Sequence, residues 1–202
     1  MIMNLGLRLG QRHRPTAVCA AEAEYFVKKG DKPRRGHFKV RYLERLPSGT
    51  SYPDAAARVA EISRAITRRT GARPKIFADA TGLGAPIVDL VAKAAGPVVS
   101  VYFNHGDRRV KESNREIKLG KAWLVARLQA LLQTGCLHLP EGAAFRDLAK
   151  DLLDYEVDVA PDANERYGAF AVGSQDELVT ALGLAVQVDP PIPMREVFYA
   201  VG

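Results

Sequence analysis

The fold is decided by residues 77–89, FADATGLGAPIVD, where a short apolar strand pattern passes into a helix pattern. The strand is expected to begin at Pro74 and to end at Asp79, and a turn with two glycines follows before Ile87 and Leu90 recur at helical spacing. Ligands of open α/β sheets bind outside the carboxyl ends of strands, so Asp79 is a candidate site residue. The alternative is that Asp79 only caps the following turn or helix.

Working outward, the patterns predict strands and helices that alternate along the chain. Strands are expected over residues 2–9, 16–25, 37–46, 74–78 and 98–103. Helices are expected over residues 53–66, 87–94, 123–132, 145–155 and 178–188, and a polar, basic loop over residues 104–118. The first three strands suggest an antiparallel meander, and the later order predicts an α/β fold with a mixed sheet and helices on both faces. This order is that of the ribonuclease H-like fold, and periodicity alone leaves other α/β folds open.

Charge is distributed unevenly along the 202 residues, whose net charge is +6. Eleven basic and four acidic residues precede residue 47, so the positive charge lies in the first quarter of the chain. This distribution is typical of a protein that binds a polyanion, and a solvated loop is the alternative.

The two cysteines, Cys19 and Cys136, lack metal-site spacing, and no apolar run reaches the length of a membrane span. We therefore expect a soluble protein of a reducing cytoplasm, without a membrane partner.

A second acidic string, residues 174–181 (SQDELVTA), precedes the last predicted helix. Nucleases that use two metal ions need clustered carboxylates, because Mg²⁺ and Mn²⁺ prefer oxygen ligands. Asp176 and Glu177 could contribute to such a cluster. Both also have structural explanations, since Ser174 and Glu177 match a capping box and Asp176 lies in the first turn of the helix.

These strings carry a resemblance to the nuclease domains of phage large terminases. It covers nearly the whole chain in the family's order, through residues 44–53 (ERLPSGTSYP), 79–90 (DATGLGAPIVDL), 119–135 (LGKAWLVARLQALLQTG), 167–170 (YGAF) and 174–181. The resemblance implies a ribonuclease H-like fold, with Asp79, Asp176 and Glu177 as catalytic metal ligands for Mg²⁺ or Mn²⁺. It further implies double-stranded DNA as substrate and, as partners, the portal, the small terminase and the ATPase domain of a phage packaging machine.

The sequence departs from the family pattern at the end of the first strand. The family commonly has Asp-Leu-Gly-Gln there, and this chain has Arg8-Leu-Gly-Gln11. A guanidinium cannot coordinate a metal ion and repels one. Either Glu22 or Glu24 on the neighbouring strand replaces the lost ligand, or the metal pair is lost; we favour loss or severe weakening. We expect Asp79 and Asp176 to converge with Arg8 beside them.

Three functions remain open at this point. The first is a metal-dependent endonuclease for phage DNA packaging, weakened or inactivated by Arg8; the second is a non-catalytic DNA- or partner-binding module, such as a prophage remnant; the third is a junction-resolving nuclease. No phosphate-binding loop of an ATPase occurs, so we expect one nuclease-type domain over residues 1–202. Basic residues expected to bind DNA are Arg12, Arg14, Lys28, Lys29, Arg34, Arg35, Arg108, Arg109, Lys111, Lys118 and Lys121.

Overall fold

The computed structural model describes residues 2–10, 14–26, 35–82, 85–159, 165–168 and 176–190. A large sheet of eight strands runs through the molecule in the order β6-β7-β5-β4-β1-β2-β3-β8. Its strands are β1 (Ile2–Arg8), β2 (Ala17–Phe26), β3 (Arg35–Arg45), β4 (Lys75–Asp79), β5 (Val98–Asn104), β6 (Arg109–Lys111), β7 (Glu116–Gly120) and β8 (Leu137–His138). A separate hairpin pairs β9 (Glu156–Val159) with β10 (Glu165–Gly168).

The sheet is mixed, as the sequence predicted. β1, β2 and β3 form the antiparallel meander, and β4, β5 and β7 then add in parallel on the other side of β1. The central order β3-β2-β1-β4-β5 is that of the ribonuclease H-like fold. Strand β1 therefore lies in the middle of the sheet, where both of its faces are covered.

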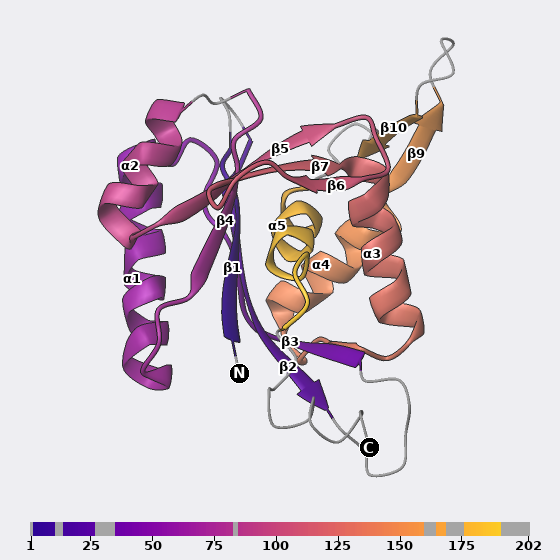
Figure 1. Cartoon of the computed structure of the whole chain (residues 1–202), viewed down its shortest axis with the longest axis horizontal. Coiled ribbons are helices and arrows are strands. Elements are labelled where there is room, and N and C mark those ends of the chain that lie inside the picture. Colours follow the sequence, from indigo (N-terminus) through magenta and orange to yellow (C-terminus); the bar gives the residue numbers. More distant parts are fainter. Residues whose placement is uncertain are drawn as a thin grey trace.

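Helices cover both faces of the sheet (Figure 1). One face carries α1 (Tyr52–Thr70) and α2 (Ala85–Ala95), and the other carries α3 (Lys121–Gln133), α4 (Ala143–Leu153) and α5 (Glu177–Ala185). Every residue of α5 is buried, so this helix forms the centre of its layer. None of the helices described is long and apolar enough to cross a membrane.

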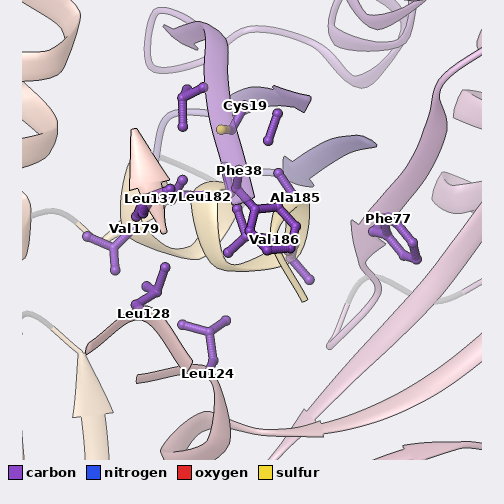
Figure 2. Packing of buried hydrophobic residues seen from close by; sticks show 14 of the residues in the cluster. Cys19, Phe38, Phe77, Leu124, Leu128, Leu137, Val179, Leu182, Ala185 and Val186 are labelled. Carbon is purple, nitrogen blue, oxygen red and sulfur yellow. The ribbon is translucent and has the colours of Figure 1, made fainter. Parts of the chain in front are cut away.

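The two faces bury two separate apolar clusters. Leu5 and Leu7 of β1 and Ile76 of β4 pack under α1 and α2. On the face covered by α3, α4 and α5, the cluster instead contains Phe38, Phe77, Leu124, Leu128 and Leu182, all of which are labelled in Figure 2. Burying a side chain of this size contributes roughly 1.5–3 kcal/mol to folding, so both faces hold the central strands firmly in place.

Several local predictions need correction. The loop expected over residues 104–118 contains β6 and most of β7. β7 pairs with β5 and β6 pairs with β7, and this pairing forms strands that the weak apolar pattern did not predict. The β9–β10 hairpin was not predicted, α4 begins at Ala143 instead of residue 145, and α5 ends at Ala185 instead of residue 188. The segment beyond residue 190 lies outside the described residues.

Candidate functional site

Strand alternation directs Arg8 toward α5. Successive side chains of a strand point to opposite faces, so Asn4, Gly6 and Arg8 share one face of β1. Asn4 donates a hydrogen bond from Nδ2 to the carbonyl oxygen of Ala185 at 3.0 Å. A Cβ atom on Gly6 would lie 1.9 Å from the carbonyl oxygen of Ala181, so only glycine allows this approach of α5. Arg8, two residues further along, therefore lies near the beginning of α5.

Asp79 reaches the same end of the sheet from the neighbouring strand. Asp79 is the last residue of β4, and the neighbouring strand β1 runs parallel to β4. The carboxyl ends of the two strands therefore lie at the same end of the sheet. The Asp79 side chain is only 4% exposed, and its Oδ2 accepts a hydrogen bond from Nη1 of Arg8 at 2.9 Å. Its Oδ1 accepts a second one from the backbone N–H of Thr81 at 2.8 Å. Each oxygen of Asp79 therefore has a partner already.

The beginning of α5 supplies the other two carboxylates. Asp176 is the N-cap residue, yet its side chain makes no capping hydrogen bond. It instead accepts a hydrogen bond at Oδ1 from Nη1 of Arg14, at 3.1 Å, and Oε1 of Glu177 lies 3.7 Å from the same nitrogen. Ser174, the other residue of the predicted capping box, lies outside the described residues.

Arg14 reaches these acids because the chain turns back sharply after β1. A Cβ atom on Gly10 would lie 2.0 Å from the carbonyl oxygen of Arg14, so the two backbones are in contact. The N–H of Gly10 also donates to Oγ1 of Thr16 at 2.9 Å. This return places Arg14 over the end of β1. Its side chain remains 54% exposed, so it lies at the rim of the site.

A pocket opens where these elements meet. Arg8, Asp79 and Asp176 line it together, as the sequence predicted, and the other lining residues are Phe103, Lys121, Leu124, Tyr155 and Thr180. Lys121 begins α3, and Gly120 before it packs against the backbone of Gly106, where any Cβ atom would clash. The pocket thus combines two cations, Arg8 and Lys121, with two carboxylates.

Glu177 lies behind this pocket instead of lining it. Its side chain is 1% exposed, and Oε2 is buried without a hydrogen-bond partner. Burial raises the pKa of Glu177, and the nearby Asp176 raises it further, whereas its backbone hydrogen bond, Arg14 and Arg45 act in the opposite direction. Glu177 is therefore a buried carboxylate that feels the positive charge of two arginines, Arg14 and Arg45.

Arg45 also forms a partly buried ion pair with Asp151 of α4. Burial raises the pKa of Asp151 to about 6, although Arg45 opposes the shift, and the negative charge of Glu177 adds to it. Nε of Arg45 is buried and has no hydrogen-bond partner. The pairing of Arg45 with Asp151 was not predicted from the sequence, since the two residues lie 106 positions apart and Asp151 belongs to none of the segments that carry the resemblance.

These residues do not fit a pair of divalent metal ions. Arg8 and Arg14 occupy the carboxylates, and Glu177 does not line the pocket. Within the described part of the chain, no three His, Cys, Asp or Glu side chains lie close enough to share an ion. The role of Asp79, Asp176 and Glu177 as catalytic metal ligands therefore stays a prediction.

The proposed replacement of the lost ligand by Glu22 or Glu24 is wrong. Glu22 pairs with Met3 across the strands, while Arg8 pairs with Ala17. Met3 and Arg8 are five positions apart along β1, roughly 17 Å at about 3.4 Å per residue. Both glutamates also have partners of their own: Arg41 lies 2.7 Å from Glu22, and Lys39 contacts Glu24.

The basic residues expected to bind DNA divide into three groups. Arg12, Lys28, Lys29, Arg34 and the side chain of Arg35 lie outside the described residues. Arg14 contacts the acids of the site, and Nε of Arg109 donates to Gln187 at 3.0 Å, in a position where burial lowers the pKa of Arg109. Arg108, Lys111 and Lys118 are exposed around the β6–β7 hairpin, and Lys121 lies in the pocket.

Comparison with solved structures identifies the fold, although no protein-family model and no curated protein matches the sequence. The large terminase nuclease from thermophilic phage G20c superposes with a TM-score of 0.62 and 20% identity, over 94% of this chain and 83% of that one. The same nuclease with bound cobalt gives 0.65 and 19% identity, over 94% and 82%. The human cytomegalovirus terminase nuclease domain gives 0.57 and 12% identity, over 92% and 82%.

At identities this low, the superpositions establish a shared fold alone. The nuclease domain of the large terminase g2p from bacteriophage SPP1, solved with bound manganese, agrees with them at a TM-score of 0.52 and 12% identity, over 93% of this chain and 86% of that one. The strand order, the position of α5 and these superpositions lead to one conclusion. This chain has the ribonuclease H-like fold of large terminase nuclease domains, and an arginine ends its first strand.

Proposed function

We propose that this domain binds double-stranded DNA in a phage packaging machine and has lost most metal-dependent cleavage. The single observation that carries this proposal is the hydrogen bond between Nη1 of Arg8 and Oδ2 of Asp79, at 2.9 Å. Asp79 ends a central strand, where the family resemblance implies a metal ligand. A bound guanidinium supplies positive charge there without being able to activate water.

The exposed basic side chains around the β6–β7 hairpin support DNA as the ligand. Arg108 is 88% exposed and Lys118 is 52% exposed, so both can reach a phosphate backbone. Such contacts bind without regard to base sequence. They release counterions condensed on the DNA, and because this release is less favourable at higher salt, the affinity falls as the salt concentration rises. The proposal includes one nuclease-type domain over residues 1–202, acting in the bacterial host cytoplasm with the portal, small terminase and ATPase domain as partners.

Binding is tested separately from cleavage. Fluorescence anisotropy with a labelled duplex in EDTA should give binding that weakens steeply between low and moderate salt. Changing Lys111 and Lys118 to glutamine should weaken it, whereas Lys93→Gln, an exposed lysine on α2, serves as the matched control. Binding that is absent at low salt, or that does not respond to salt, would refute DNA as the ligand.

Cleavage is measured with supercoiled plasmid and Mn²⁺. The unmodified protein should nick poorly, and Asp79→Asn should leave that low rate unchanged. Robust nicking that Asp79→Asn abolishes would instead establish an active endonuclease and contradict the proposal.

A metal-dependent endonuclease is the second candidate function. The observation that favours it is that Asp79 and Asp176 line one pocket. In that case these two carboxylates, with Glu177 behind them, would hold Mg²⁺ or Mn²⁺, which would activate water and stabilise the leaving oxygen of the phosphodiester. Arg8 and Arg14 would first have to move away, and the plasmid assay distinguishes the two candidates.

A further inference from the structure

Arg8 neutralises only half of the acidic cluster. Its hydrogen bond goes to Asp79, while Asp176 and Glu177 belong to α5 and contact a different cation, Arg14. A single substitution in the first strand thus does not account for the electrostatics of the whole site.

Arg14 contacts both of the remaining carboxylates with one nitrogen. Its Nη1 lies 3.1 Å from Oδ1 of Asp176 and 3.7 Å from Oε1 of Glu177. This position between two carboxylate oxygens is one that a shared cation would take. The contact spans 162 residues of sequence, so it depends on the turn after β1 returning to the beginning of α5.

We infer that Arg14 is a second resident cation of the site, which closes its Asp176–Glu177 half as Arg8 closes its Asp79 half. The two guanidinium groups take the places at which the carboxylates could receive divalent ions. Restoring an acid at position 8 consequently restores only weak metal binding, because Arg14 still repels an ion from the other half. This inference rests on the proposed function, since it explains how the site stays without metal.

Arg14 differs from Arg8 in accessibility. Its side chain is 54% exposed, compared with 18% for Arg8. It can therefore be replaced with little disturbance of the core, so Arg14→Gln removes the charge and keeps a side chain of similar length. Arg14→Lys keeps the charge and is the matched control.

The test measures Mn²⁺ binding by titration calorimetry on the unmodified protein, on Arg8→Asp, and on Arg8→Asp combined with Arg14→Gln or with Arg14→Lys. The unmodified protein should show no saturable binding, and Arg8→Asp should bind weakly. Adding Arg14→Gln should tighten binding at least about tenfold over Arg8→Asp alone, whereas adding Arg14→Lys should leave it near the Arg8→Asp value. Equal affinity of Arg8→Asp and of its Arg14→Gln combination would overturn the inference, as would no binding by that combination.

Two further measurements keep the test decisive. Circular dichroism melting confirms that each variant is folded, and Arg8→Ala replaces Arg8→Asp throughout if the added carboxylate prevents folding. Tb³⁺ luminescence, sensitised by Tyr155 in the pocket, locates the ion at this site, and it should rise with Arg14→Gln and not with Arg14→Lys. These readouts need no DNA. Failure of DNA binding in EDTA would therefore reject the proposed function while leaving the effect of Arg14 on metal binding measurable.

Discussion

Two clusters of arginine and carboxylate side chains lie on opposite faces of the sheet, and they use the same chemistry with different consequences. The site cluster consists of Arg8, Arg14, Asp79, Asp176 and Glu177 on the α5 face. The outer cluster consists of Tyr42, Glu44, Arg58 and Glu61 on the α1 face.

Exposure separates the two clusters. Arg58 reaches both oxygens of Glu44, at 2.9 and 3.2 Å, but the two side chains are 40% and 26% exposed. Water therefore screens that pair, and such pairs typically contribute no more than about 1 kcal/mol. Arg8 and Asp79 are far less exposed, so removal of either partner leaves a poorly solvated charge. The exposed Arg58–Glu44 pair only joins α1 to β3. The Arg8–Asp79 pair also occupies a carboxylate oxygen that could otherwise bind a metal ion.

The largest effect should come from separating β1 and α5. Gly6→Ala places a Cβ atom against the carbonyl oxygen of Ala181, which is backbone and cannot move aside without shifting the helix. We expect the free energy of unfolding to fall by about 3 kcal/mol or more, as for severe overpacking. Urea denaturation measures it, and Gly106→Ala, whose Cβ atom would meet only the side chain of Asn104 at close range, is the control. A loss below about 1 kcal/mol would show that α5 does not approach β1 so closely.

Removing one charge from each cluster sharpens the comparison directly. Asp79→Asn keeps the oxygen that accepts from Thr81 but leaves Arg8 without its counter-ion. We expect a loss of about 2–3 kcal/mol, somewhat below the cost for a fully buried pair because Arg8 is partly exposed. Equal losses for Asp79→Asn and Glu44→Gln in parallel urea titrations would contradict the distinction drawn between the clusters.

The pH dependence of stability should report the ionisation of Asp151, whose partner Arg45 lies near Glu177. Because burial raises the pKa of Asp151 to about 6, the folded state holds this proton more tightly than the unfolded state. The resulting stabilisation is complete below about pH 4 and is lost as pH rises through about 6. Relative to Asp151→Asn, the unmodified protein should therefore lose on the order of 2 kcal/mol between those values. Denaturation curves across this range measure it, with Asp89→Asn, an exposed acid of α2, as the control. Parallel pH profiles of the unmodified protein and Asp151→Asn would show that this carboxyl is not perturbed.

The smallest effect belongs to the rim of the outer cluster. Glu61 is 56% exposed and contacts Arg58 from three residues along α1, at 2.9 Å. Glu61→Gln should change stability by about 0.2–0.5 kcal/mol, and high salt should abolish the difference. Thermal melting at two salt concentrations measures it. A loss above about 1 kcal/mol that persists in high salt would place this pair with the buried ones.

Much of the fold could be predicted from the local periodicity of apolar residues. The strand, turn and helix around Asp79 are readable because each depends on residues close in sequence, and alternation in β1 places Asn4, Gly6 and Arg8 on one face. The replacement of the family's aspartate by Arg8 could also be recognised from the sequence, because the residues of the motif have fixed spacing. By contrast, β6 and β7 were read as a loop, since a strand with few apolar residues is recognised only by the neighbour with which it pairs.

The partners of charged side chains were decided by the tertiary structure. From the sequence, Arg14 belonged equally well to a DNA-binding loop, and Glu22 was as good a replacement ligand as any acid on the next strand. Strand register places Glu22 at the far end of β1, and the turn at Gly10 returns Arg14 to Asp176 and Glu177. Electrostatic attraction acts through space over a few ångströms, so it depends on which elements pack together. The residue types and their order along the chain determined the fold and revealed Arg8 in place of the family's aspartate. Only the packing of α5 against β1 determined which arginines neutralise the acids of the site.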